Sequence, residues 1–268
     1  MPMLTLPQGK VHYRKMGVGT NYLVLLHANP GDSKDYNAII DALTRNYCVI
    51  TIDWPGYGTS DAPEPIDKAS VNYFYDVLKG VIDEKALAEV TLMGNSIGGY
   101  AAARYAAEFP ERVKSLVLIS PAGFTNHNAM TRLFCRLQAS SLAIPPIVLA
   151  NFYLKGGSTW VKTMKSRALK EYGKTVPFAI NRAIWRSMLL PDADLREKAK
   201  NIRCPTLLFF GQYDPLVSAK HDAKIAQAVI PHAELHISET GHAVFAESPE
   251  YFLGFVLKFL RKIYPNAA

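Results

Sequence analysis

The stretch Gly94-Asn95-Ser96-Ile97-Gly98-Gly99 decides the fold class of this 268-residue chain. It directly follows an apolar, β-rich run at 90–93 and opens an amphipathic helical pattern at 98–108. A serine on such a strand-to-helix turn has a strained backbone and an exposed hydroxyl, and the flanking glycines avoid clashes with the adjacent strand and helix. The spacing differs from G-x-G-x-x-G and from the lysine-bearing Walker loop. The stretch therefore predicts a nucleophile elbow that presents Ser96.

Short apolar runs alternate with amphipathic stretches on both sides of this elbow. Strands are predicted at 10–16, 22–27, 48–53, 90–93, 115–120, 206–210 and 233–237, the first two as a pair. Helices are predicted at 35–44, 73–87, 98–108, 219–228 and 251–261. This order predicts an α/β fold, with a mostly parallel sheet and helices on both faces.

The net charge of +7 is unevenly distributed along the chain. Residues 121–200 hold 13 basic and four acidic residues, a net of +9, which leaves −2 for the remainder. Strand signals are absent from the same region. We therefore predict a core domain of residues 1–121 and 199–268 that carries a helical cap of residues 122–198. The charge lacks a recognised nucleic-acid-binding motif, so no nucleic-acid partner is expected.

Composition excludes several other classes of protein. With 49% apolar and 20% charged residues, the chain can bury a full core and is neither disordered nor a mini-protein. Three scattered cysteines, Cys48, Cys135 and Cys204, fit neither a disulfide framework nor a zinc site, which favours a cytoplasmic location and no metal. The longest uncharged run, 137–154, contains Pro145 and Pro146, and it predicts two short buried helices rather than an integral membrane segment.

A nucleophilic serine needs a base, and the base needs a group that fixes its tautomer. Asp214 follows the predicted strand 206–210, and His242 follows the last predicted strand in the same way. The chain order Ser96, Asp214, His242, with all three on strand-end loops, predicts a catalytic triad. The oxyanion would be stabilised by two backbone N–H groups, those of Ile97 and Asn29. His27 is interpreted as a brace for the Asn29 loop.

These motifs together resemble the α/β-hydrolase superfamily across essentially the whole chain. His27-Ala28-Asn29-Pro30-Gly31 resembles its H-G-x-P-G loop, with Ala28 in place of the usual glycine. Asp53-Trp54-Pro55-Gly56-Tyr57-Gly58-Thr59-Ser60 resembles its D-x-P-G-x-G-x-S turn. The resemblance implies an eight-stranded sheet with a helical cap inserted after the sixth strand, which is where residues 122–198 fall.

Two subfamilies share parts of the pattern. Asn29-Pro30 is similar to the loop of haloalkane dehalogenases, but those enzymes use an aspartate nucleophile followed by a tryptophan, where this chain has Ser96 and Ile97. The stretch 94–99 also resembles the meta-cleavage-product C–C hydrolases, whose substrates are acidic dienols. Those enzymes generally carry tryptophan after the catalytic histidine, where this chain has Ala243.

The predicted activity is hydrolysis of a carboxylic ester, thioester or lactone through an acyl-enzyme on Ser96, without metal or organic cofactor. C–C bond hydrolysis of an acidic dienol or diketone is one alternative, and a non-catalytic small-molecule receptor is another. The partner is then a small molecule, and the chain is a monomer or homodimer. The basic cap is interpreted as favouring anionic substrates. Its predicted substrate-binding residues are Phe124, Trp160, Arg182, Trp185 and Arg186, with Phe134, Leu137, Phe152, Phe178 and Met188 as further pocket walls.

Overall fold

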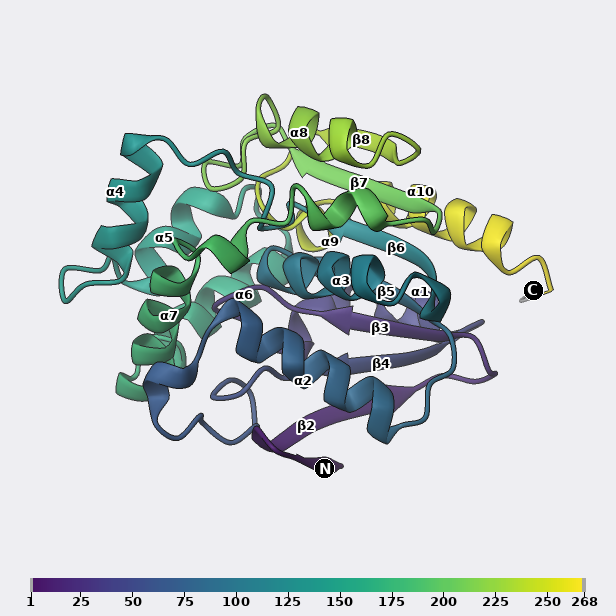
Figure 1. The fold of residues 1–268 in the computed structure, drawn as a ribbon, viewed down its shortest axis with the longest axis horizontal. Coiled ribbons are helices and arrows are strands. Elements are labelled where there is room, and N and C mark those ends of the chain that lie inside the picture. Colours follow the sequence, from purple (N-terminus) through teal and green to yellow (C-terminus); the bar gives the residue numbers. More distant parts are fainter. Residues whose placement is uncertain (1, 267–268) are drawn as a thin grey trace.

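A computed structural model describes residues 2–266, and its centre is an eight-stranded sheet (Figure 1). The strand order is β1-β2-β4-β3-β5-β6-β7-β8. The strands from β3 to β8 are parallel, whereas β1 and β2 pair antiparallel with each other and β2 pairs antiparallel with β4. The bounds are β1 Met3–Leu6, β2 Gly9–Met16, β3 Tyr22–Leu26, β4 Cys48–Ile52, β5 Val90–Asn95, β6 Val113–Ile119, β7 Thr206–Gly211 and β8 Glu234–Ser238. The predicted α/β class and mostly parallel sheet are confirmed.

The N-terminal strands differ from the prediction in two ways. β2 and β3 do not pair, because β4 lies between them. The physical reason is burial: β3 is almost wholly buried and takes a parallel partner on each side, whereas β2 has only two buried residues, Val11 and His12, and lies near the edge. In addition, β1 forms a hairpin with β2. Its four residues lie between Pro2 and Pro7, too short a run to show a strand pattern.

Helices cover both faces of the sheet, since β4, β5 and β7 are buried along their whole length. In Figure 1, α2 and α3 lie in front of the strands. The helices of this layer system are α1 Ile40–Thr44, α2 Val71–Glu84, α3 Ile97–Glu108, α8 Asp222–Val229, α9 Val244–Glu247 and α10 Pro249–Ile263. Shorter 3₁₀ turns lie at Ser33–Ala38, Ile66–Lys68, Pro110–Arg112, Pro191–Ala193 and Lys198–Asn201.

Between β6 and β7 the chain forms helices and no strand. These helices are α4 Ala129–Gln138, α5 Pro146–Tyr153, α6 Thr159–Lys170 and α7 Thr175–Ser187. They gather at the end of the molecule toward which the arrowheads of β3 and β7 point (Figure 1). We call residues 122–198 the inserted segment. It therefore lies beyond the carboxyl ends of the parallel strands, where loops carry functional side chains in open α/β sheets.

The uncharged run at 137–154 departs from its prediction. It contains the end of α4 and a single further helix, α5, on which Val148 and Phe152 are 41% and 61% exposed. Two short buried helices were expected there. Among residues 2–266, no helix combines the length and the apolar character that a bilayer crossing requires.

Candidate active site

Ser96 lies on the sharp turn between β5 and α3. Its backbone has φ 55° and ψ −115°, a conformation that non-glycine residues rarely adopt. The neighbouring glycines make this turn possible, because a Cβ atom on Gly94 would lie 2.2 Å from the carbonyl oxygen of Gly98. A Cβ atom on Gly98 would in turn lie 2.1 Å from the carbonyl oxygen of Leu26. The strained strand–turn–helix geometry of a nucleophile elbow is therefore present.

His242 and Asp214 form a buried pair next to this elbow. Nδ1 of His242 lies 2.6 Å from Oδ2 of Asp214. The other carboxylate oxygen of Asp214 accepts hydrogen bonds from the backbone N–H groups of Leu216 and Val217, at 2.8 and 3.2 Å. With Nδ1–H donating to the carboxylate, Nε2 of His242 is left unprotonated and can act as a base.

The surroundings of His242 raise its pKa. Burial lowers the pKa, but the negative charge of Asp214, the hydrogen bond to it and the charge of Glu247 together outweigh burial. Glu247 also shapes the loop, because its carboxylate accepts the N–H groups of Gly241 and Ala243 at 2.6 and 3.0 Å. Sequence reasoning missed Glu247, whose only signal is its position five residues after the histidine.

Two further contacts hold the His242 backbone. The Nδ2 group of Asn95 donates to the carbonyls of His242 and Ile119, at 3.0 and 2.9 Å, and so links the elbow to the histidine loop. The N–H of His242 donates to the carbonyl of Tyr153 at 2.8 Å, and the two rings are in edge contact. Tyr153 belongs to α5, so the inserted segment directly positions the candidate base.

The candidate oxyanion donors, the N–H groups of Ile97 and Asn29, donate no hydrogen bond to another described residue. Ile97 is the first residue of α3, where the helix dipole favours negative charge. The side chain of Asn29 accepts a hydrogen bond from the Tyr57 hydroxyl at 2.6 Å and donates one to Asn181 on α7 at 2.8 Å. The Asn29 loop is thus held from both the core and the inserted segment.

His27 braces the loop as expected. Its Nδ1 lies 2.7 Å from the carbonyl oxygen of Ala28, and its Nε2 accepts the backbone N–H of Trp54 at 2.9 Å. These partners place the ring proton on Nδ1. Complete burial lowers the pKa of His27, so the ring is neutral and structural.

Ser96, His242 and Asn29 line a single cavity of about 410 Å³. Most of its wall is apolar and comes from the inserted segment, including Met130, Phe134, Leu149, Phe152, Trp185 and Met188. No lysine or arginine of the described chain lines it. His127 does, and its pKa is lowered chiefly by burial. An apolar wall with a few convergent polar groups is typical of a small-molecule site.

Only some of the predicted substrate-binding residues line the cavity in the structure. Trp185 lines the cavity, as do the predicted wall residues Phe134, Phe152 and Met188. Four others do not line it. Phe124 is fully buried in the core, Trp160 is 38% exposed, Arg186 pairs with Asp67 at 3.5 Å, and the Nε atom of Arg182 is buried without a hydrogen-bond partner among the described residues. Leu137 and Phe178 are also absent from the wall. Helical periodicity identifies the inner face of a helix but not whether that face meets the core or a cavity.

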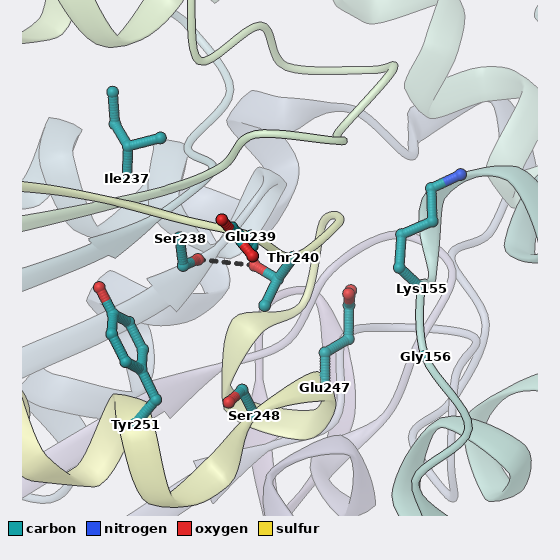
Figure 2. Close-up of a pocket in the computed structure, with 9 residues that line it drawn as sticks. All are labelled: Lys155, Gly156, Ile237, Ser238, Glu239, Thr240, Glu247, Ser248 and Tyr251. Atoms are coloured by element: carbon teal, nitrogen blue, oxygen red, sulfur yellow. Dashed lines mark hydrogen bonds between the residues drawn. The ribbon is translucent and has the colours of Figure 1, made fainter.

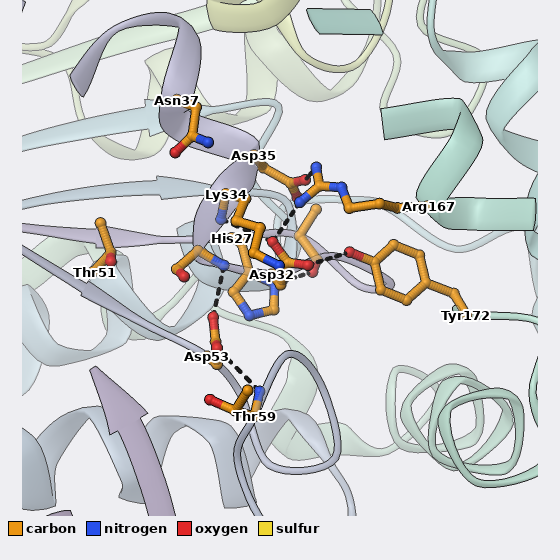
Figure 3. A network of polar contacts seen from close by, with 12 residues as sticks. His27, Asp32, Lys34, Asp35, Asn37, Thr51, Asp53, Thr59, Arg167 and Tyr172 are labelled. Carbon is orange, nitrogen blue, oxygen red and sulfur yellow. Dashed lines mark hydrogen bonds and ion pairs between the residues drawn. The ribbon is translucent and has the colours of Figure 1, made fainter. Parts of the chain in front are cut away.

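A buried ionic cluster ties the inserted segment to the loop that follows Asn29 (Figure 3). Arg167 on α6 pairs with Asp32 and Asp35, and the Tyr172 hydroxyl donates to Asp32 at 2.9 Å. Arg167 is one of the 13 basic residues at 121–200, and nothing in the sequence distinguished it from the others. Its charge is used inside the protein rather than at the surface.

A second cavity of about 430 Å³ is lined by residues on both sides of His242 in the sequence, together with Lys155 and Gly156 (Figure 2). Its lining includes Glu247, Thr240 and Lys155, and the amino group of Lys155 points away from the other labelled side chains. Neither Ser96 nor His242 lines this cavity. It is therefore distinct from the candidate active site.

Comparison with known proteins agrees with this fold. A family model described as the α/β-hydrolase fold matches residues 21–142. A 2-hydroxy-6-oxononadienedioate/2-hydroxy-6-oxononatrienedioate hydrolase of Burkholderia vietnamiensis is 29% identical over 267 residues, covering 94% of this chain and 91% of that protein. The family model and this relative support membership of the α/β-hydrolase superfamily.

Solved structures of α/β hydrolases share the whole architecture. A membrane phospholipase A matches with a TM-score of 0.82 at 23% identity, over 98% of this chain and 86% of that one. An esterase from Thermogutta terrifontis matches with a TM-score of 0.79 at 21% identity, over 98% of both chains. The relatives support hydrolytic activity for this α/β hydrolase, while these structural matches show the fold alone.

Proposed function

We propose that this α/β hydrolase is a serine hydrolase that cleaves a carboxylic ester, thioester or lactone through an acyl-enzyme on Ser96. The observation that carries the proposal is the buried His242–Asp214 pair on the same cavity as the strained Ser96 turn. Nε2 of His242 takes the Ser96 proton while Oγ attacks the carbonyl carbon. The N–H groups of Ile97 and Asn29 stabilise the oxyanion, each donor contributing about 10²- to 10³-fold in rate.

The second half of the reaction uses the same groups. His242 gives its proton to the leaving alcohol or thiol, and the acyl group stays on Ser96. Nε2 then takes a proton from water, whose oxygen attacks the acyl carbon. Collapse of this second intermediate releases the acid and returns the proton to Ser96. Asp214 stays ionised throughout and stabilises the imidazolium.

We also propose that residues 122–198 act as a cap domain over a core of residues 1–121 and 199–268. The cavity supports this division, because it is walled by Ser96 and His242 on one side and by α4, α5 and α7 on the other. The basic charge of the cap was predicted to favour anionic substrates, but no cationic side chain of the described residues lines the cavity. We therefore propose neutral, predominantly apolar substrates.

Labelling with a fluorophosphonate probe tests the nucleophile. The wild type should be labelled and Ser96→Ala should not, with circular dichroism confirming that the variant is folded. Matched neutral and anionic esters then test the cavity, and the neutral ester should show the higher kcat/KM. Equal labelling of both proteins would show that the probe reacts outside Ser96 and would overturn the proposed nucleophile. Labelling of neither protein, with no turnover of an activated ester, would instead favour a non-catalytic small-molecule receptor.

Hydrolysis of a C–C bond is the second candidate. It is supported by the Burkholderia vietnamiensis relative, whose name specifies a dienedioate or trienedioate substrate. Such a substrate carries two carboxylates, whereas this cavity is apolar and lacks lysine and arginine. Loss of dienol absorbance, measured beside ester turnover on the same preparation, separates the candidates. A kcat/KM for the dienol above that for every ester would replace the ester proposal.

A further inference from the structure

One face of the inserted segment exposes an unusual amount of apolar surface. We call it the α4–α5 face and define it by five exposed large apolar residues on α4, α5 and the turn between them: Met130, Leu133, Leu142, Val148 and Phe152. Their exposures are 78, 68, 75, 41 and 61%. Single exposed apolar residues are ordinary, whereas a group within 23 residues indicates an interaction surface.

The charge on this part of the chain has one sign. Residues 112–170 contain no aspartate or glutamate, while 121–170 contain seven basic residues. Only Arg167 among those seven is buried. On α4 the cations lie among the apolar residues, because Arg132 and Arg136 are one turn apart and share the exposed side of the helix with Leu133. Mixed basic and exposed apolar side chains are typical of helices that lie in a lipid interface.

The candidate active-site cavity opens toward the same face. Met130 and Phe152 belong to the α4–α5 face and also line the cavity, together with Ser96 and His242. A molecule that leaves a surface apposed to this face therefore meets an apolar path to the candidate nucleophile.

We propose that the α4–α5 face docks on an anionic lipid surface. Charge complementarity supports this occupant, since juxtamembrane basic residues are attracted to anionic lipid headgroups. A second copy of the chain fits less well, because a two-fold contact through this face would set basic residues against basic residues. Nucleic acid would use the cations but would leave the five apolar side chains exposed. The proposal goes beyond ester hydrolysis and does not rest on it.

Vesicle co-sedimentation tests the proposal on Ser96→Ala, so that the result is independent of catalysis. This protein should bind vesicles containing phosphatidylserine at least about tenfold more tightly than pure phosphatidylcholine vesicles at low salt. High salt should remove most of the difference. Adding Arg132→Gln and Arg136→Gln should weaken binding about 25-fold, since each surface cation contributes about fivefold.

The matched control is the pair Lys258→Gln and Lys262→Gln. These lysines are also exposed and four residues apart, but they lie on α10, at the opposite end of the molecule from α4 (Figure 1). This variant should bind within about twofold of the parent protein, because its cations lie on the end of the molecule that faces away from the docked surface and are screened by salt. An equal loss in the two variants would reduce the effect to net charge and overturn the proposal.

Replacing exposed leucines by serine tests the contribution of apolar contacts to vesicle binding. Leu133→Ser with Leu142→Ser should weaken vesicle binding while leaving its salt dependence intact, and Val18→Ser, exposed to 66% in a distant loop, should not. Circular dichroism and urea denaturation, compared with Ser96→Ala alone, check that the surface variants are folded. Absence of any preference for phosphatidylserine vesicles overturns the proposal. So does a wild-type dimer that the leucine substitutions dissociate, or retention on an anionic polynucleotide in place of vesicles.

Discussion

Residues 2–266 contain two buried histidine–aspartate pairs, and only one of them has the setting of a catalytic base. Nδ1 lies 2.6 Å from the carboxylate in His242–Asp214 and 2.8 Å in His12–Asp53. His242 lines the cavity that Ser96 also lines. The Nε2 atom of His12 is instead buried without a hydrogen-bond partner among the described residues. A buried histidine–aspartate pair therefore does not make a catalytic base by itself. The histidine gains a chemical role only where its Nε2 atom can reach a nucleophile.

The carboxylates of the two pairs also differ in what they hold. Asp214 accepts two N–H groups from its own turn, which fixes the loop that carries it. Asp53 accepts the N–H groups of Ser33 and Thr59 at 2.7 and 3.2 Å, so it joins separate segments of the chain. Burial alone would raise the pKa of Asp53, but the interactions with His27, Ser33 and His12 lower it overall. Asp53 is therefore a structural anion.

Replacing each of the two histidines should give the largest effect and tests whether only His242 acts as a base. His242→Ala should lower kcat about 10⁶-fold, because the base is lost while the fold is retained. His12→Ala should leave kcat per folded molecule unchanged and lower the free energy of unfolding by about 1–3 kcal/mol. Ester turnover and urea denaturation measure the two effects. Comparable losses of kcat in both variants would show that lining the cavity does not give His242 a role that His12 lacks.

The aspartates offer the next largest effect. Asp214→Asn should lower kcat about 10⁴-fold, because the amide no longer fixes the tautomer of His242 or stabilises its charged form. Asp53→Asn should keep kcat and lower the free energy of unfolding by about 2–3 kcal/mol, through weaker bonds to Ser33 and Thr59. Single-turnover kinetics with each purified variant separate these outcomes. A normal kcat for Asp214→Asn would remove it from the proposed triad.

The buried aspartates Asp32 and Asp35 are paired with an arginine, Arg167, and not with a histidine. Arg167→Met leaves Asp32 and Asp35 buried without their charged partner, and it should lower the free energy of unfolding by about 3–5 kcal/mol. The exposed Arg132→Met on α4 is the control and should change stability by about 0.5 kcal/mol or less. Equal stabilities of the two variants in urea denaturation would mean that the cluster is solvated.

The smallest expected effect is a shift of pH dependence. His242 acts as a base only when neutral, so kcat/KM should rise with pH through a pKa above the ordinary 6.5. Glu247→Gln removes a negative charge that raises this pKa, and the acidic limb of the profile should move to lower pH. Glu239→Gln, an exposed neighbour in the sequence, should leave the limb in place. A shift toward higher pH for Glu247→Gln would contradict the electrostatic assignment.

The fold and the candidate triad were largely predictable because their signals are local. Ser96, Asp214 and His242 each follow a strand within a short, recognisable turn, and parallel strands bring such turns to one edge of the sheet. The pairing of β2 with β4 was not predictable, because strand neighbours depend on burial across the whole sheet. The cavity wall was predicted only in part for a similar reason: Trp185 and Phe124 look alike in sequence but face different surroundings.

The α/β class, the elbow at Ser96 and a basic, strand-free insertion can all be read from the sequence, because each follows from contiguous residues and their periodicity. Tertiary structure alone decided which of the basic residues is buried, which histidine–aspartate pair faces a cavity, and that the cavity is apolar. These properties arise from contacts between residues far apart in the chain, as between Arg167 and Asp32. Desolvation and ion pairing at such contacts depend on distance in space, which no local pattern encodes.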